Sequence, residues 1–403
     1  MKILLTTIGS RGDIQPYIAL AIGLQKSGHE VKIATHPWAA SLIEHYHLSH
    51  VPVGKNIDIH YAARQFVQHS TNPIQGMRFA LNFIFDQLRA CHRDFLNVMK
   101  DAEAVIGHGI VGQAEADILD KPFVSVSIDT MGLRKEYWKS NNIPKELGIF
   151  LFDTIGNLLF GGPYKKFMKE MAVPSNKTNK KQPYLALVPI SPSIQKAHPN
   201  WKHRTEITGY LFADAPDHFK PPEALTDFIH SGEKPLLFTF GSMFHQENDT
   251  RKLYQTLCKS LTQTGQRALL IMPDLDRKSI ETPNNLFITE NIPYSWLLKQ
   301  VSAVIHHFGF GTSAEVLKSG IPSVPLPHIF DQNMRAKEIY QKGLATKPLN
   351  PKHINSQQLT KAIEQAKSDQ KLISRCRETG ERIARENGVE KAVECINKYL
   401  TEK

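Results

Sequence analysis

The chain has 403 residues, of which 41% are hydrophobic and 22% charged, as is typical of a folded globular protein. This length exceeds one ordinary core and predicts two domains. Nucleic acid, an anionic membrane surface or an anionic small molecule would each fit the formal net charge of +10. The basic residues form no cluster with aromatic residues, which argues against nucleic acid. A solvated basic surface is the favoured interpretation, and weak peripheral contact with a membrane stays open.

Three further features bear on the compartment. No run of about 18 apolar residues occurs, so the sequence predicts no transmembrane helix. The amino-terminal apolar run is too short for a signal peptide and is interpreted as a first strand. The four cysteines are scattered without metal-binding or redox spacing: Cys91, Cys258, Cys376 and Cys395. These patterns predict a cytoplasmic protein without a bound metal.

The amino-terminal segment has the pattern of a βαβ unit. An apolar strand is predicted from Lys2 to Thr7 and is followed by the loop IGSRGDIQP. A helix is predicted from Pro16, as a first-turn proline, to Ser27, with Gly28 as its carboxyl-terminal cap. The segment VKIAT then forms the next strand. Such units build parallel sheets.

The same pattern restarts near Lys234. A strand, PLLFTFGSM, ends in a Gly-Ser turn, and the following segment has leucine at every fourth position: Leu253, Leu257 and Leu261. This spacing predicts one buried face of a helix. RALLIMP, NLFITENIP, SAVIHH and PSVPLP are predicted to be the remaining strands. The sequence therefore predicts a second, independent α/β sheet.

Three segments fall outside these patterns. Residues 191–222 are rich in proline and polar residues and are predicted to be the linker between the sheets. Residues 79–99 are predicted to be helical. The apolar stretch GIFLFDTIGNLLFGG, at 148–162, fits either a buried helix or an element that touches acceptor or membrane, and burial is favoured.

The segment from Val301 to Gln332 carries the most specific pattern in the chain. A predicted strand ends in two histidines, a turn with two glycines follows, and a threonine opens a helix: His306, His307, Gly309, Gly311 and Thr312. Glycines allow close approach of the backbone to a ligand, and a helix N-terminus presents free N–H groups. This arrangement predicts a diphosphate cradle with His307 and Thr312 as side-chain donors. A simple strand-to-helix turn with a buried histidine is the alternative.

Polar residues downstream support the first interpretation. Glu315 lies one turn into the predicted helix, where its carboxylate can accept hydrogen bonds from ribose hydroxyls. Asp331 and Gln332 follow PSVPLP, at the carboxyl end of a strand, where open α/β sheets bind ligands. An acid beside an amide suits the recognition of sugar hydroxyls, whereas Asp331 alone would more often cap a helix.

This segment resembles the donor-binding motif of the UDP-glycosyltransferases, glycosyltransferase family 1, whose usual form is HHGGxGT, GxP and DQ. Here the motif reads HHFGFGT, GIP and DQ, with Phe308 and Phe310 in place of a glycine and a small residue. This change leaves the identity of the sugar open. GSRGDIQPYIAL, from Gly9 to Leu20, resembles the amino-terminal motif of the branch of sterol 3-beta-glucosyltransferases and glycopeptide-aglycone glucosyltransferases.

The resemblance implies an α/β architecture of GT-B type, with two Rossmann-like domains whose parallel sheets face an interdomain cleft. Residues 1–215 would bind the acceptor, 216–389 the nucleotide sugar, and 390–403 would form a helix packing back on the first domain. FGSM and ENIPYSWLL resemble segments that approach the donor phosphates and the uracil, with Trp296 favoured as core. The implied donor-binding residues are Ser10, Gly241, Ser242, Ile292, Pro293, His307, Gly309, Gly311, Thr312, Glu315, Asp331 and Gln332.

By the same resemblance, Asp13 is the catalytic base of an inverting, metal-independent hexosyltransferase. UDP-glucose would be the default donor, and a sterol or natural-product aglycone the acceptor. Three histidines are rival bases without a supporting motif: His36, His60 and His108. An epimerase or phosphorylase of similar architecture is disfavoured by GSRGD, and a catalytically silent protein that binds a lipid or nucleotide sugar is the second alternative. Asp13 could also simply cap the first helix.

Overall fold

The structure is a computed structural model that describes residues 1–58, 61, 65, 73–128, 162–174, 184–197, 201, 204–214, 219–240, 247–272, 281–290 and 292–402. The chain forms two compact units. The first unit comprises Met1–Ile57, Met77–Ala213 and Glu386–Lys403. The second unit comprises Asp58–Gly76 and Asp214–Arg385. By this division the chain changes units after Ile57, Gly76, Ala213 and Arg385.

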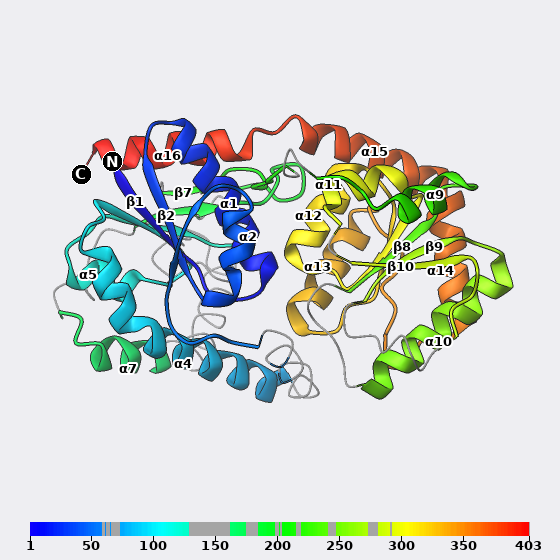
Figure 1. The fold of residues 1–403 in the computed structure, drawn as a ribbon, viewed down its shortest axis with the longest axis horizontal. Helices are drawn as coiled ribbons and strands as arrows, with labels where there is room; N and C mark the ends of the chain where they lie inside the picture. Colours follow the sequence, from blue (N-terminus) through cyan, green and yellow to red (C-terminus); the bar gives the residue numbers. More distant parts are fainter. Residues whose placement is uncertain are drawn as a thin grey trace, which may run out of the picture. The chain divides into compact units, whose positions relative to one another are not determined.

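The first unit is built on a seven-stranded sheet in the order β3-β2-β1-β4-β5-β6-β7 (Figure 1). Its strands are β1 (Lys2–Thr6), β2 (Glu30–Thr35), β3 (Ser49–Pro52), β4 (Ala104–His108), β5 (Phe123–Val126), β6 (Leu185–Val188) and β7 (Thr205–Ile207). Every neighbouring pair is parallel. The strand order reverses between β1 and β4, and open α/β sheets bind ligands at the carboxyl ends of such strands.

Helix α1 (Arg11–Lys26) begins five residues earlier than predicted, so Pro16 lies inside it and the predicted start at Pro16 is wrong. The start is set at Ser10, whose backbone N–H donates to the Asp13 carboxylate at 2.7 Å. Such a reciprocal cap outweighs the single helical hydrogen bond that the proline omits. The predicted end is confirmed. Gly28 has a left-handed φ of 86° and donates to the carbonyl of Gln25 at 2.9 Å.

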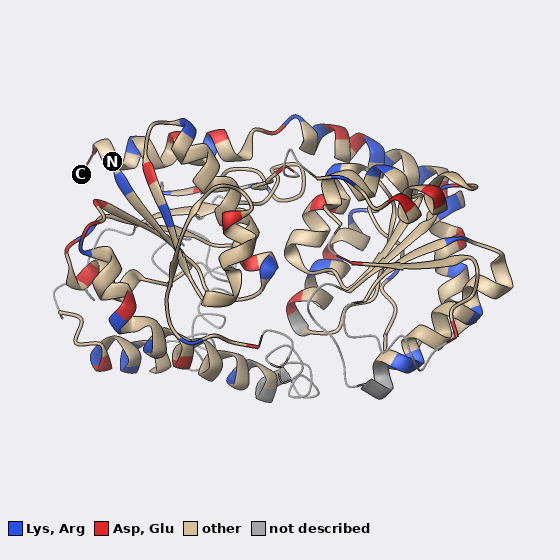
Figure 2. Cartoon of the chain, viewed as in Figure 1, with Lys and Arg blue, Asp and Glu red and all other residues tan. Residues whose placement is uncertain are grey.

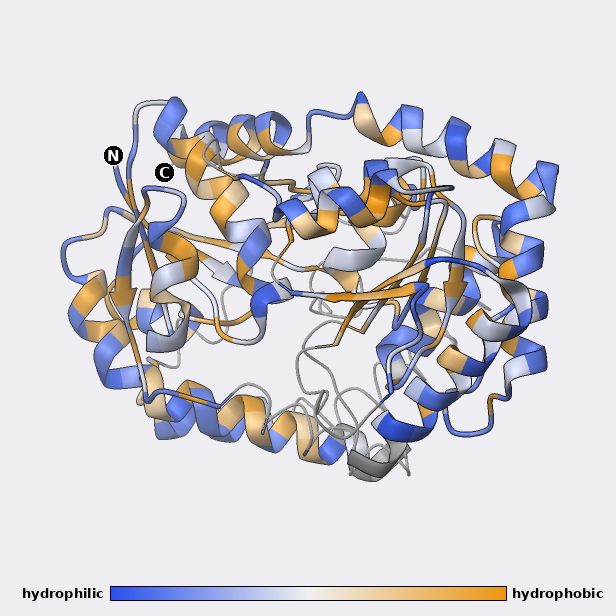
Figure 3. Ribbon diagram, turned by 45° about the vertical axis from the view of Figure 1, so that its right-hand side comes forward, coloured by the Kyte–Doolittle hydropathy of each residue, from blue (hydrophilic) through white to orange (hydrophobic). Residues whose placement is uncertain are grey.

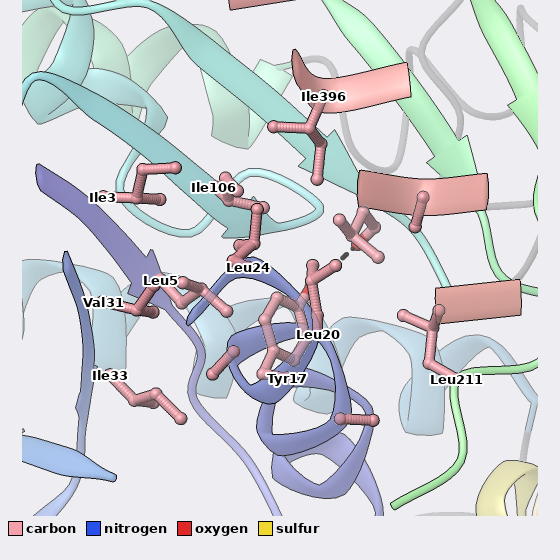
Figure 4. Close-up of a cluster of buried hydrophobic side chains, with 14 of the residues drawn as sticks. Ile3, Leu5, Tyr17, Leu20, Leu24, Val31, Ile33, Ile106, Leu211 and Ile396 are labelled. Carbon is pink, nitrogen blue, oxygen red and sulfur yellow. Dashed lines mark hydrogen bonds between the residues drawn. The ribbon is translucent and has the colours of Figure 1, made fainter. Parts of the chain in front are cut away.

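One core cluster of the first unit lies between this sheet and α1, and a second packs the sheet against α4, α5 and α7, whose bounds are given below. Figure 4 shows Tyr17, Leu20 and Leu24 of α1 beside aliphatic side chains of β1 and β2. Ile396, from the carboxyl-terminal helix α16 (Gly388–Thr401), belongs to the same cluster. α16 therefore completes a core whose other members come from the first two hundred or so residues of the chain.

The remaining helices of this unit flank the sheet. They are the short helix η1 (Pro37–Ala39), α2 (Ala40–Glu44), α4 (Pro73–Met99), α5 (Gln113–Ile118) and α7 (Gly162–Glu170). α4 confirms the helix predicted at 79–99. Most of the apolar stretch at 148–162 lies outside the described residues.

The predicted linker at 191–222 is wrong in part, because β7 lies within it and pairs with β6. Only three residues form this edge strand. A strand this short among prolines and polar residues shows no recognisable hydrophobic pattern in the sequence.

The second unit is built on a five-stranded parallel sheet in the order β10-β9-β8-β11-β12. The strands are β8 (Leu236–Thr239), β9 (Ala268–Ile271), β10 (Leu286–Thr289), β11 (Ala303–His306) and β12 (Ser323–Pro325). All five strands were predicted from the sequence. The order reverses between β8 and β11, which again marks the carboxyl ends of two neighbouring strands as a ligand-binding position.

The helices of the second unit are α9 (Glu223–His230), α10 (Glu247–Thr264), α11 (Tyr294–Leu297), η5 (Leu298–Gln300), α12 (Phe310–Ser319), α13 (Phe330–Gln341), α14 (Ser356–Ser368) and α15 (Gln370–Ala384). Leu253, Leu257 and Leu261 of α10 are all buried, as their spacing predicted. α12 packs closely on α15. A Cβ added to Gly380 of α15 would lie 2.6 Å from the backbone of Gly320, which ends α12.

Hydropathy and charge both vary along the helices. In Figure 3 the strands are coloured mainly as hydrophobic, while the flanking helices alternate between hydrophilic and hydrophobic residues. In Figure 2 basic and acidic residues are interspersed along the described helices. Every helix among the described residues is too short or too polar to cross a lipid bilayer. The four cysteines are free thiols, two buried and two partly buried.

Candidate active site

The loop after β1 holds the predicted base in a fixed position. The Oδ2 atom of Asp13 accepts hydrogen bonds from the backbone N–H of Ser10 at 2.7 Å and from its Oγ at 2.9 Å. Gly9 has a φ of 137°, and a Cβ there would lie 2.4 Å from the same oxygen. Glycine is therefore required for the carboxylate to fold back over the loop. The half-buried Asp13 caps α1 and keeps its second oxygen, Oδ1, for another partner.

One of the rival bases lies beside this loop. His108 ends β4, the neighbour of β1, and its Nδ1 is 3.4 Å from Oγ1 of Thr7, which also donates to the Asp13 carbonyl at 3.2 Å. The ring of Tyr17 is centred 5.7 Å from the His108 ring. Burial, and then the charge of Asp13, raises the pKa of Tyr17, so this phenol stays protonated. His108, named from the sequence as a rival base without a supporting motif, thus lies beside the loop that carries Ser10.

The other two rival bases are not supported. His36 is only 1% exposed, and burial lowers its pKa, so it is poorly placed to meet an acceptor. His60 lies outside the described residues.

The turn after β11 places two histidines at the sheet's reversal point. His306 pairs in register with Thr239 of β8 and Pro325 of β12, so the loops that follow these three strands start side by side. His307 is 5% exposed, and a Cβ on Gly309 would lie 2.4 Å from its Nε2. Gly309 is therefore needed for the histidine and the backbone to pack closely.

Phe308 has an unusual backbone conformation for a bulky residue. Its φ is 62°, in the left-handed region, where the common family motif has glycine. The Phe308 ring is 1% exposed and stacks on His306 with ring centroids 4.2 Å apart. Burial of the ring and this stacking therefore offset the backbone strain.

We expect Phe308→Gly to destabilise the protein although it relieves that strain. Loss of the buried ring costs about 3–5 kcal/mol. Glycine removes the steric cost of the left-handed conformation, which stabilises the protein by only about 1–2 kcal/mol. Urea unfolding should give a net loss of about 2 kcal/mol, and Phe308→Ala, which keeps the strain, should be less stable than Phe308→Gly. A glycine variant more stable than the parent would contradict this expectation.

Buried polar atoms without partners cluster at the N-terminus of α12. Nδ1 of His307, Nε2 of His306 and Oγ of Ser313 are buried without a hydrogen-bond partner among the described residues. Burial lowers the pKa of His307 to about 4. A hydrogen bond with the Thr239 backbone raises this pKa by less, and the charge of Arg335 lowers it further. His307 is therefore a neutral hydrogen-bonding group near pH 7. Buried polar atoms of this kind are costly unless a ligand satisfies them.

Glu315, one turn into α12, carries no hydrogen bond among the described residues. Burial raises the pKa of its carboxyl group to about 7, while Lys318 lowers it and Asp214 raises it. A carboxylate in this state gains by accepting hydrogen bonds from a ligand, since such bonds favour its ionised form. This property fits the predicted ribose contact.

Donor affinity should therefore depend on pH. Ribose hydroxyls would bind the ionised form of Glu315, of which about one tenth exists at pH 6 and nine tenths at pH 8 for this pKa of about 7. Calorimetry with UDP-glucose should give a Kd about tenfold lower at pH 8 than at pH 6, levelling off above that. Glu315→Gln should remove the slope, and an unchanged slope in that variant would contradict the assignment.

Asp331 and Gln332, which follow β12, have different surroundings. Gln332 is 2% exposed, and its Oε1 accepts from the backbone N–H groups of His328 at 2.9 Å and Ile329 at 3.3 Å, so it caps α13. Asp331 is exposed, and its Oδ2 lies 3.6 Å from Nη1 of Arg335. Of the two residues predicted to bind sugar hydroxyls, Asp331 thus has a side chain exposed to solvent. The amide oxygen of Gln332 is already bonded, so only its NH₂ group could bind a sugar.

The remaining predicted positions lie near β8 and β11. Ile292 is a buried core residue, and Pro293 precedes α11, where the hydroxyl of Tyr294 is 2.6 Å from Oγ1 of Thr239. Trp296 packs edge-on against Phe219, in agreement with its predicted core role. Thr312 and Gly311 lie in the first turn of α12. Gly241 and Ser242 lie outside the described residues.

Two family models match different parts of the chain. The glycosyltransferase family 28 N-terminal domain matches residues 3–110. The C-terminal domain described as erythromycin biosynthesis protein CIII-like matches residues 257–400. The first match includes the Asp13 loop and His108, and the second includes the turn after β11, Glu315 and Asp331.

Curated relatives match the chain from end to end. A sterol 3-beta-glucosyltransferase of Komagataella phaffii is 25% identical over an alignment of 420 residues, which covers 98% of this chain and 34% of that protein. Another, of Sclerotinia sclerotiorum, is 27% identical and covers 98% and 29%. One from Arabidopsis thaliana is 25% identical and covers 99% and 68%. The chain thus spans about a third of the length of the two fungal relatives.

Solved structures share the fold. The glycosyltransferase of kitacinnamycin superposes with a TM-score of 0.75 at 18% identity, covering 99% of each chain. The glycosyltransferase VinC in complex with DTDP has a TM-score of 0.72 at 16% identity and covers 100% of each. The chain thus has the GT-B fold, and its sequence resembles the UDP-glycosyltransferases of the branch that contains the sterol 3-beta-glucosyltransferases.

Proposed function

We propose that this protein transfers glucose from UDP-glucose to a hydroxyl group of a lipophilic acceptor, a sterol or a natural-product aglycone, with inversion and without a metal. The single observation that carries the proposal is the N-terminus of α12. There the buried His307 Nδ1 and Ser313 Oγ have no hydrogen-bond partner in the described part of the chain, and they lie beside the free N–H groups of a helix. A nucleoside diphosphate satisfies all of these groups at once, because it is an anion with many acceptor oxygens.

The acceptor side of the reaction falls to Asp13. Its Oδ2 is held by Ser10, and Oδ1 makes no hydrogen bond with the residues that the structure describes, so the carboxylate has a fixed orientation and one oxygen for an acceptor proton. As general base, Asp13 would take the proton while the acceptor oxygen attacks the anomeric carbon. The bond from that carbon to the phosphate oxygen breaks on the opposite face, and the anomeric configuration inverts.

Departure of UDP requires stabilisation of negative charge on the leaving phosphate. The α12 N-terminus, the neutral His307 and the hydroxyl of Thr312 can supply it as prearranged hydrogen-bond donors. We find no group of three or more histidine, cysteine, aspartate or glutamate side chains suited to a metal ion among the described residues. Metal independence is part of the proposal, and activity in the presence of excess EDTA tests it.

The acceptor class is proposed from the relatives. The curated relatives are sterol 3-beta-glucosyltransferases, and the solved neighbours include glycosyltransferases of kitacinnamycin and calicheamicin. The sterol glucosyltransferases favour a lipophilic acceptor, whereas the solved neighbours, at 18% identity, support only the fold. Weak contact with an anionic membrane, with which the net charge of +10 is compatible, would give access to a sterol, and co-sedimentation with anionic vesicles tests this contact.

The stereochemical result gives a sharp test of the mechanism. With UDP-glucose, an α-linked donor, direct displacement predicts a β-glucoside, which proton NMR of the isolated product would identify by its anomeric coupling. An α-glucoside would exclude single displacement with Asp13 as base.

One observation favours a second candidate, a catalytically silent protein that binds the nucleotide sugar. Phe308 and Phe310 stand in the cradle where the family motif has smaller residues. The charged and polar residues Asp13, His307, Glu315 and Asp331 are nevertheless present, and a decayed site would tend to lose them. Tight UDP-glucose binding without turnover for any acceptor would favour this second candidate.

A further inference from the structure

The side chain of Arg335 joins α13 to the turn that opens α12. Its Nη1 donates to the carbonyl oxygen of Phe308 at 2.9 Å. The guanidinium carbon lies 5.4 Å from the centroid of the Phe310 ring, within the range of a cation–π contact. The carboxylate of Asp331, one turn earlier on α13, lies 3.6 Å from the same Nη1 atom.

These contacts fall on the two residues where the turn departs from the glycine-rich form. Phe308 takes the left-handed backbone that glycine would adopt freely, with φ of 62°. The buried Phe308 ring offsets this strain from within the turn, and a contact from another helix would hold the turn further. Arg335 supplies it at 17% side-chain exposure, where a charge-assisted hydrogen bond is only partly weakened by water.

The bonded atom also matters electrostatically. A carbonyl oxygen carries partial negative charge and would repel a phosphate if it turned toward the N–H groups of the α12 N-terminus. The bond from Arg335 commits the Phe308 carbonyl to α13. The backbone N–H groups that follow are then left to face an anion.

We propose that Arg335 is a positioning residue that holds the turn at residues 308–312 in the conformation that binds the donor diphosphate. This inference rests on the proposed function for its effect on catalysis, but the hold on the turn is a property of the protein alone. Arginine suits the task better than lysine, because its planar group can serve the carbonyl, the ring and the carboxylate together.

The test compares Arg335→Gln with Lys337→Gln, which removes a positive charge from an exposed position on the same helix. Arg335→Gln should raise the KM for UDP-glucose about tenfold or more, the usual effect of losing a hydrogen bond from a charged group. Amide hydrogen exchange in the peptide spanning 306–313 should become faster, while exchange in α14 stays the same. Arg335→Lys should recover part of both effects, and Lys337→Gln should show neither.

Unchanged exchange at 306–313 in Arg335→Gln would overturn the proposal, and so would equal effects from Lys337→Gln. Thermal melting verifies that each variant folds, and Arg335→Lys serves the exchange measurement if the glutamine variant does not fold. If the parent protein binds no nucleotide sugar, the proposed function fails, yet the exchange comparison still decides whether Arg335 holds the turn.

Discussion

Asp13→Asn is expected to lower kcat by about 10³-fold while the KM for UDP-glucose changes little, because general-base catalysis contributes about 10²–10⁴. Asparagine has the same shape, and its oxygen can still accept from the Ser10 N–H that donates to Asp13 at 2.7 Å. The variant should therefore keep the cap of α1 and lose only the proton acceptor. Initial rates at saturating acceptor, beside a thermal melt, would measure both properties.

His108→Asn is the matched comparison for this experiment. His108 lies beside the same loop through Thr7, at 3.4 Å, and is the one rival base that the structure brings to the site. If Asp13 is the base, His108→Asn should cost much less activity than Asp13→Asn. The reverse order, with His108→Asn nearly inactive and Asp13→Asn active, would assign the proton transfer to the histidine.

His307→Ala is expected to lower kcat by about 10²-fold, the usual effect of removing one prearranged donor to a developing negative charge. The pKa of His307 is lowered to about 4 by burial, so near pH 7 it acts as a neutral hydrogen-bond donor rather than as a cation. His307→Asn, whose side-chain amide lies close to the position of Nδ1, should therefore recover part of the loss. A lysine at this position should not.

The pH profile separates the two possible roles of His307. As a neutral donor it should produce no inflection in kcat between pH 6 and pH 8, since its pKa of about 4 lies well below this window. Full activity of His307→Ala would remove this residue from the site. An inflection that disappears in His307→Asn would instead show that the residue titrates during turnover.

Strand positions and the glycine-rich turn were readable from the sequence because their signals are local. Periodic leucines, short apolar runs and Gly28 each report on the residues next to them, and the structure confirms these elements. The position of His307 at the end of a strand and of Thr312 in a first helical turn follows from the same kind of signal.

The features that the sequence did not predict depend on contacts between distant residues or on competition between two local signals. At α1, the cap formed by Ser10 and Asp13 outweighed Pro16, so the helix began earlier than the proline suggested. Arg335 acts on Phe308, 27 residues away, and no spacing in the sequence indicates that contact.

Gln332 illustrates a different limit of sequence reasoning. Beside Asp331 it suggested a reader of sugar hydroxyls, but its amide oxygen is bound to the backbone of His328 and Ile329. An amide can cap a helix or bind a ligand, and only its surroundings decide between these uses.

Incubation of the purified protein with UDP-glucose and a panel of sterols and macrocyclic aglycones, followed by mass spectrometry, tests glycosyl transfer most directly. We predict a product one hexose heavier than its acceptor with the parent protein, and no such product with Asp13→Asn run beside it. Failure of the parent protein to bind any nucleotide sugar would contradict the proposed function.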